Sequence, residues 1–275
     1  MRLNPAGQND RGGQLNPVFR GIRIAALLTL LVVVAGNQFL TGSRFSSWDK
    51  PLWISIYPVL AGPESNIRRY TDSLDADSFR DIGEFIKREA ARYGRQIDTP
   101  VVIQVARPLT SMPPALPAQS SGLGVALWSL KMRWWSYRNG GQDGLAPDDI
   151  RMFVLYQVGQ PNTMLERSVG IKNGSYGVVN AVASRAMAAR NRIVISHELM
   201  HILGASDKYN PLNGQPTAPE GLANPEQSPI YPQKRAEIMA GRIATSASHW
   251  RRAASLKSCV IGAATAAEIG WLVSS

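Results

Sequence analysis

The amino-acid sequence predicts a mixed α/β (α+β) fold in one domain, because strand-like and helix-like segments alternate along it without an internal repeat. Its 275 residues are 44% hydrophobic and 18% charged, which suits a chain that buries a sizeable core. The single cysteine excludes an internal disulfide framework and a cysteine-rich metal cluster. The ligands of any bound metal must therefore be histidine, aspartate or glutamate.

The N-terminal segment differs from the rest in composition. Residues 24–43 carry no charge and are long enough to cross a bilayer as a helix of about 20 residues. The positive-inside rule predicts a cytoplasmic tail over residues 1–23, since four arginines precede the apolar run: Arg2, Arg11, Arg20 and Arg23. We expect a single-pass signal-anchor in the cell membrane, with residues 44–275 extracytoplasmic, in the periplasm or outside the cell. A signal peptide cleaved near Ala35 and a buried core helix are the alternatives.

The domain after this segment begins with a strand and a helix. Residues 53–59 alternate as a strand does. Residues 73–94 follow, with apolar side chains at helical spacing: Phe79, Ile82, Ile86, Ala90 and Tyr93. Together they form the first strand-helix unit.

Further strands are predicted downstream. Residues 100–106 and 150–158 are apolar enough to lie at the centre of a sheet. Residues 168–183 form a further strand or a hairpin, with Asn173-Gly174 as its tight turn. This segment ends shortly before a helix that carries two of the three histidines.

Aromatic and basic residues are mixed in "LWSLKMRWWSYR", residues 127–138, which follow a Pro-rich loop at 107–122. That composition suits a membrane interface or a sugar- or peptide-binding surface. The interpretation that we favour is an amphipathic helix packed on the sheet with its charges in water.

The segment "RIVISHELMHILG" predicts a metal site. His197 and His201 are four residues apart on a helix, so they project from one face and can hold one cation. The flanking residues are apolar nearly all round, which predicts a buried helix, and burying Glu198 without a cationic partner is costly. His-Glu-x-x-His is the pattern of a zinc site with a general base, and composition alone predicts about 0.001 chance matches. The alternative is two histidines that bind no metal, either hydrogen-bonded on a buried helix or without a role on an exposed one.

The third ligand that the spacing favours is Asp207. Gly204 can let the chain leave the helix through a left-handed turn, which brings Asp207 back toward the metal. Asp207 can instead cap the next turn or bind calcium in the turn-rich segment that follows it. The other candidate ligands are His249, Glu220, Glu226 and Glu237.

The pattern His-Glu-x-x-His-x-x-Gly-x-x-Asp, followed by "AEIMAGR" at 236–242, resembles the metzincin clan of zinc endopeptidases, in the snapalysin-type variant with aspartate as third ligand. The resemblance covers residues 193–242 closely. It implies a zincin domain with a mixed twisted sheet, an active-site helix and a methionine turn at Met239. It further implies a Zn²⁺ ion and the general base Glu198, with these zinc ligands: His197, His201 and Asp207.

The resemblance also implies where substrate lies. The strand before the active helix would border the cleft, where an extended peptide can add as another strand. Residues 208–235, which are rich in Pro and Gly, would shape the pocket beside the scissile bond. Many clan members have a tyrosine two residues after the turn methionine, but Gly241 stands there in this chain. Tyr209 is therefore the candidate for any tyrosine contribution.

These patterns predict a membrane-anchored, zinc-dependent endopeptidase, in which zinc activates a water and Glu198 acts as base. Its expected partners are a peptide or protein substrate and the membrane, through the N-terminal helix. The net charge of +10 attracts anions, yet no nucleic-acid recognition element or dense basic stripe is present. A catalytically inactive, zincin-fold binding protein of the cell envelope is the alternative. Cys259 is expected to be a core residue.

Overall fold

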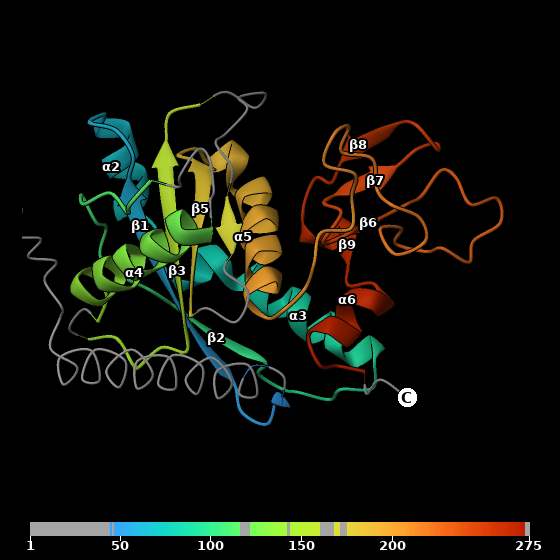
Figure 1. The fold of residues 1–275 in the computed structure, drawn as a ribbon, viewed down its shortest axis with the longest axis horizontal. Coiled ribbons are helices and arrows are strands. Elements are labelled where there is room, and N and C mark those ends of the chain that lie inside the picture. The colour runs from blue at the N-terminus through green and yellow to red at the C-terminus, as the bar shows by residue number, and fades with distance from the viewer. Residues whose placement is uncertain are drawn as a thin grey trace, which may run out of the picture. The chain divides into compact units, whose positions relative to one another are not determined.

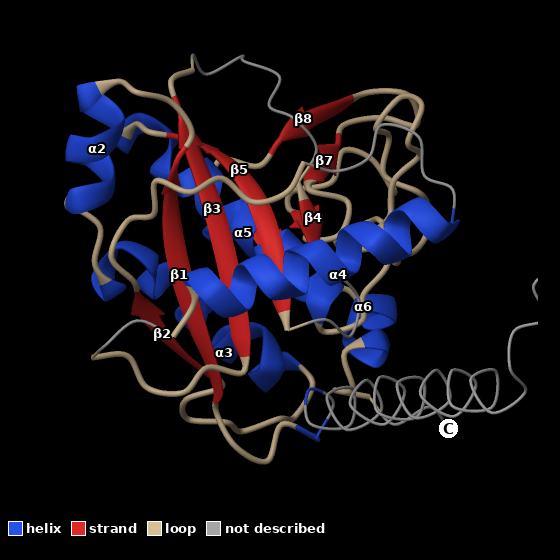
Figure 2. Ribbon diagram, turned by 60° about the vertical axis from the view of Figure 1, so that its left-hand side comes forward, coloured by secondary structure: helices blue, strands red, loops and turns tan. Residues whose placement is uncertain are grey.

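A five-stranded sheet forms the centre of the protein, in agreement with the predicted mixed α/β fold (Figures 1 and 2). Its strand order is β2-β1-β3-β5-β4, and four strands are parallel while β4 is antiparallel to β5. The strands are β1 (Leu52–Leu60), β2 (Val101–Val105), β3 (Ile150–Gln157), β4 (Val169–Gly170) and β5 (Tyr176–Val182). The computed structural model describes residues 45, 47–115, 122–141, 144–159, 168–170 and 175–272, all within one compact unit.

The bounds of the three strands expected at 53–59, 100–106 and 150–158 are confirmed to within two residues. The expected central position of the second strand was wrong, because among the described strands β2 pairs only with β1, lies at the edge of the sheet and is mostly half-buried. Eight of the nine residues of β1 are buried, because helices cover both faces of the sheet at this point. The segment expected as a strand or hairpin is a short antiparallel pair, β4 and β5. Its predicted turn, Asn173-Gly174, lies outside the described residues.

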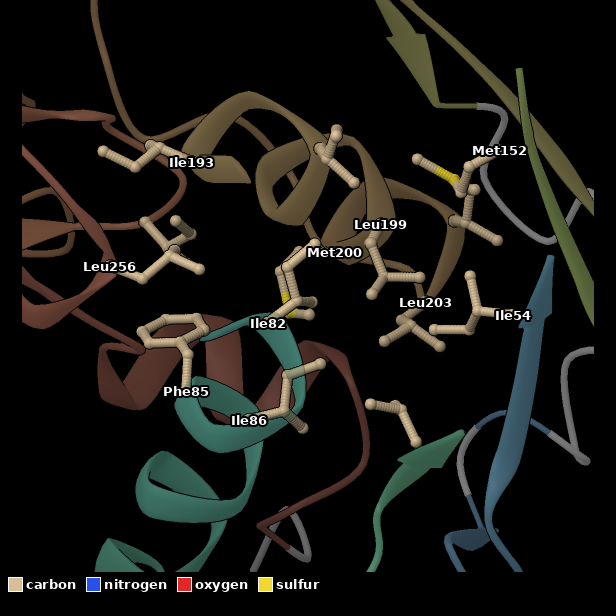
Figure 3. Close-up of a cluster of buried hydrophobic side chains, with 14 of the residues drawn as sticks. Ile54, Ile82, Phe85, Ile86, Met152, Ile193, Leu199, Met200, Leu203 and Leu256 are labelled. Atoms are coloured by element: carbon tan, nitrogen blue, oxygen red, sulfur yellow. The ribbon is translucent and has the colours of Figure 1, made fainter. Parts of the chain in front are cut away.

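Alternate side chains of β1, β3 and β5 enter two separate apolar cores, as the two-residue period of a strand requires. One core lies between the sheet and α2 (Ser65–Asp72), α3 (Arg80–Arg92) and α5 (Ala188–Ile202). Figure 3 shows part of it, where side chains of α3 and α5 converge with Ile54 and Met152 from the sheet. The second core lies on the opposite face, beneath α4 (Gly122–Asn139).

The helix predicted over residues 73–94 is shorter than expected. Asp75 is the N-cap residue, since its Oδ1 accepts a hydrogen bond of 2.9 Å from the backbone N–H of Ser78. A 3₁₀ turn, η1 (Ala76–Phe79), follows this cap and leads directly into α3. Residues 73–75 therefore lie outside the helix, and α3 itself ends at Arg92.

α4 packs on the sheet as the favoured interpretation predicts. Trp128, Met132 and Trp135 are buried, and the Trp135 ring meets Phe153 of β3 edge-on at 4.8 Å between centroids. Among the helices that the structure describes, none is both long and apolar enough to span a bilayer. The expected anchor at 24–43 and the tail at 1–23 lie outside the described residues.

The chain after α5 forms a small C-terminal region of short elements. Two strand pairs occur here, β6 (Ala236–Glu237) with β9 (Cys259–Val260), and β7 (Arg242–Ala244) with β8 (Trp250–Arg252). The 3₁₀ turn η3 (Leu256–Ser258) and α6 (Ala263–Glu268) complete it. Residues 208–235, all described, contain no helix or strand, as their composition predicts. Cys259 is fully buried, as expected, and burial raises the pKa of its thiol to about 12.

Candidate metal centre

Two imidazoles and one carboxylate converge at the C-terminal end of α5. The Nε2 atoms of His197 and His201 are 3.1 Å apart, and Asp207 Oδ1 lies 3.2 Å from each of them. Four ligands in a tetrahedron around zinc, each about 2.0–2.1 Å from the ion, are separated from one another by about 3.3 Å. The three side chains therefore already have the mutual spacing of a zinc ligand set.

The other ring nitrogen of each histidine is held by the backbone. His197 Nδ1 lies 3.0 Å from the carbonyl oxygen of Ile238, and His201 Nδ1 lies 2.9 Å from that of Ala205. A carbonyl oxygen only accepts hydrogen bonds, so Nδ1 carries the proton in both rings. The lone pair of each neutral imidazole is consequently on Nε2, at the point where the three side chains meet.

Gly204 makes the return of the chain possible, as the sequence predicts. Its φ is 114°, in the region that favours glycine, and it follows directly after the C-cap residue Leu203. The chain then turns back, and Ala205 donates its N–H to the carbonyl oxygen of Met200 at 2.9 Å. Asp207 reaches the histidines three residues after the glycine.

The turn at Glu237–Gly241 supports the site from the other side. It supplies the Ile238 carbonyl that orients His197, and the carbonyl of Met239 accepts the N–H of Lys208 at 3.1 Å. The Met239 side chain is fully buried in the core that also contains α5. This turn thus fixes both a histidine ring and the segment that carries Asp207.

The charges at the site favour an added cation. Burial alone would raise the pKa of Asp207, but the hydrogen bonds that the two imidazoles donate from Nε2 when they carry a second proton hold that pKa well below its usual range. Burial would lower the pKa of His201, yet the bonds to Asp207 and the Ala205 carbonyl, with the charge of Glu198, raise it. Positive charge, whether from protons or a metal ion, is therefore stabilised where the three side chains meet.

Glu198 is 5% exposed and follows His197 on α5. Its charge acts on His201, which places its carboxylate within electrostatic reach of the imidazoles. Glu198 is not part of the His197–His201–Asp207 cluster, and its charge is one of the causes that raise the pKa of His201.

The structure separates Asp207 from the other candidate ligands. Of the described residues, the cluster that could hold a metal contains His197, His201 and Asp207 alone. The remaining candidates lie elsewhere: His249 contacts the hydroxyls of Ser246 and Ser248, Glu220 faces Lys208, Glu226 is exposed, and Glu237 is buried. The Glu237 carboxylate accepts bonds from the N–H groups of Ala240 and Gly262 and from the Thr265 hydroxyl, so it stabilises the turn.

An aromatic stack that sequence reasoning missed lies next to the site. The Tyr209 ring is 6.5 Å from the His197 ring, and the Arg242 guanidinium lies 5.0 Å from the Tyr209 ring centre. Trp250 covers the other side of Arg242 at 4.5 Å, and Arg242 Nη1 donates to the carbonyl of Gly214 at 2.8 Å. The β7–β8 pairing brings Arg242 and Trp250 together, and no sequence spacing links them to Tyr209.

Comparison with known proteins gives no family for this chain: no family model matches it, and no curated protein matches it. The functional conclusion therefore depends on the site itself.

Proposed function

We propose that the protein is a zinc-dependent endopeptidase of metzincin type. The observation that carries the proposal is the ligand set, in which three donor atoms lie 3.1–3.2 Å from one another with both imidazoles oriented by backbone carbonyls. Two imidazoles and a carboxylate suit zinc, and three protein ligands leave a fourth position for water or substrate. Such an incomplete protein ligand set is typical of catalytic zinc, whereas structural sites are closed.

The chemistry follows from the ligands and their neighbour. A zinc ion held by His197, His201 and Asp207 supplies a Lewis acid that acidifies water and polarises a peptide carbonyl. Glu198 accepts the proton that the attacking water loses. The carbon–nitrogen bond then breaks, and Glu198 returns the proton to the leaving amine. Ser and Cys nucleophiles are not needed, in keeping with the inert, buried Cys259.

The metzincin assignment rests on the order of features along the chain. A left-handed glycine follows the second histidine, and a turn with a buried methionine lies behind the site. Tyr209 is the candidate donor to the carbonyl oxygen as negative charge develops there, because its ring lies beside that of His197. The strand directly before α5 was expected to border the cleft, but this strand, β5, pairs with β3 and β4 and is not the edge strand; the sheet edge on this side is β4. An extended peptide or protein substrate would add to that edge.

The proposal includes the location that the sequence predicts. The apolar segment 24–43 would anchor the protein in the cell membrane, with the metal centre extracytoplasmic. The expected partners remain a peptide or protein substrate and the membrane.

The test compares full-length wild type with Glu198→Gln and, as a matched control, His249→Gln, whose imidazole lies outside the cluster. Metal analysis measures zinc per chain, and a mixed peptide library measures cleavage. We expect all three to bind zinc, His249→Gln to cleave as the wild type does, and Glu198→Gln to lose about 10²–10⁴-fold in kcat. Absence of zinc from the wild type would refute the proposal. Zinc binding without cleavage by any form would favour the alternative, an inactive binding protein.

A further inference from the structure

The outward side of α4 carries a cluster of apolar residues that the proposed function does not use. Ten large hydrophobic residues are exposed among the described ones, and four of them lie on this helix. They are between 52% and 81% exposed: Leu127, Leu130, Trp134 and Tyr137. A helix that packs on a sheet normally turns polar side chains to solvent, so these four need a separate explanation.

The four residues form one continuous stripe. At about 100° per residue they fall within an arc of about 80° on the helix surface. The buried residues Trp128, Met132 and Trp135 occupy the opposite side, against the second core. α4 therefore has two apolar sides, one covered by the sheet and one exposed.

Basic residues border the stripe on both sides. Lys131 and Arg138 lie along one edge and Arg133 along the other, and all three are exposed. The Arg138 guanidinium lies 4.9 Å from the centre of the Trp134 ring. The helix contains no aspartate or glutamate.

We propose that this side of α4, defined by Leu127, Leu130, Lys131, Arg133, Trp134, Tyr137 and Arg138, binds the surface of an anionic lipid bilayer. Charge complementarity selects this partner, because lysine and arginine beside the stripe match acidic headgroups and no acidic side chain of the helix opposes them. Trp and Tyr are the residues that favour the boundary between headgroups and acyl chains, with the ring buried and the polar edge hydrated. The apolar arc then enters the interface while the bases remain at headgroup level.

The proposal does not depend on the metal centre. α4 and α5 cover opposite faces of the sheet (Figures 1 and 2). A bilayer bound through α4 therefore lies on the opposite side of the sheet from α5 and the metal centre at its end. Binding would fix the orientation of the domain and would not block the site.

The experiment uses the full chain with a polarity-sensitive fluorophore on Leu130→Cys. The native Cys259 is fully buried, so the label reacts at the introduced position. Leu212→Cys is the matched control, because Leu212 is 94% exposed and lies in the C-terminal region. Each protein is reconstituted into vesicles of phosphatidylcholine alone, or of phosphatidylcholine and phosphatidylglycerol in equal parts, with and without brominated acyl chains.

We expect a blue shift and quenching by brominated lipid at position 130 in the phosphatidylglycerol vesicles, and neither at position 212. High salt and the triple change Lys131→Gln, Arg133→Gln, Arg138→Gln should each abolish the signal at position 130. Trp134→Ser, which leaves the charge unchanged, should weaken it while the unfolding temperature stays that of the wild type.

Three outcomes would overturn the proposal. A label at position 130 that remains in a water-like environment in anionic vesicles excludes lipid contact. An equal shift in phosphatidylcholine alone points to an apolar contact, such as the chain's own segment 24–43. A shift that appears without lipid and grows with protein concentration identifies a second copy of the chain as the occupant.

Discussion

α4 and α5 cover opposite faces of one sheet, and they depart in opposite ways from the simple amphipathic pattern of a helix such as α3. α5 buries polar residues, Glu198 and Asn191 among them, within an apolar sequence. α4 exposes apolar residues, Trp134 and Tyr137 among them. Polar groups inside and apolar groups outside both cost free energy, so each departure marks a place where the helix serves something besides the core.

The largest expected effect is a loss of folding stability when a side chain on the buried side of α4 is shortened. Met132 is fully buried, so Met132→Ala should lower the free energy of unfolding by about 2–5 kcal/mol. Leu130, two residues earlier and 56% exposed, should change it by less than about 0.5 kcal/mol when replaced by alanine. Urea denaturation measures both. An equal decrease in the free energy of unfolding for both variants would mean that the outward stripe is part of a packed core. The contrast between α4 and α5 would then be wrong.

A second prediction concerns Asp207, the proposed ligand that follows α5 in the sequence. Asp207→Asn keeps the size of the side chain but removes its negative charge. It should weaken zinc binding by about 100-fold, since the loss of a hydrogen-bond partner behind a ligand already weakens metal affinity by up to about that factor. Competition with a chelator measures the affinity. Glu226→Gln removes an exposed carboxylate outside the cluster and provides the control. Unchanged affinity in Asp207→Asn would remove Asp207 from the ligand set.

The smallest effect concerns the support of the segment that carries Asp207. Lys208, 6% exposed, donates to Glu268 at 2.8 Å, and Ser206 donates to the same carboxylate. Burial alone would raise the pKa of Glu268, but these hydrogen bonds hold it below its usual range. The stabilisation is therefore present above the unfolded-state pKa of Glu268 and is lost as pH falls through its lower folded-state pKa.

Glu268→Gln should accordingly lower stability by less than about 1 kcal/mol at neutral pH, because the pair is only partly buried. The difference from the wild type should shrink in acid, and thermal unfolding as a function of pH measures it. A difference that grows as pH falls would show that the charge of Glu268 is not the cause.

Sequence patterns predict the sheet better than its surroundings. β1 and β3 were predicted closely because an apolar run buried on both faces has few other uses. β2 was found by the same apolar pattern, but its place at the edge of the sheet depends on pairing that the pattern does not specify. The helix expected from residue 73 begins later because Asp75 caps a 3₁₀ turn that leads into α3, in agreement with an apolar spacing that begins only at Phe79. The composition of residues 127–138 allowed a membrane interface as one interpretation, but the favoured amphipathic pattern was wrong, since α4 has two apolar sides, which cancel the periodicity on which such predictions depend.

Sequence patterns likewise predict some residues of the candidate site and miss others. His197, Glu198 and His201 are adjacent on one helix, and helix geometry alone brings the histidines together. Gly204 makes the approach of Asp207 predictable from spacing. Arg242 and Trp250 were missed because their place beside Tyr209 depends on contact with a segment far away in the sequence, which the local β7–β8 hairpin does not specify.

The turn at Glu237–Gly241 has a consequence for how the protein can vary. It is tied to His197 through Ile238 and to Lys208 through Met239, so the stretch between Lys208 and Glu237 is a closed loop whose ends are already fixed. Doubling the length of such a loop costs only about 0.6 kcal/mol of closure entropy. Insertions and deletions there can accumulate without displacing the histidines. Under the proposed function, changes in the length of this loop would alter the surface beside the metal centre while leaving the two histidines in place.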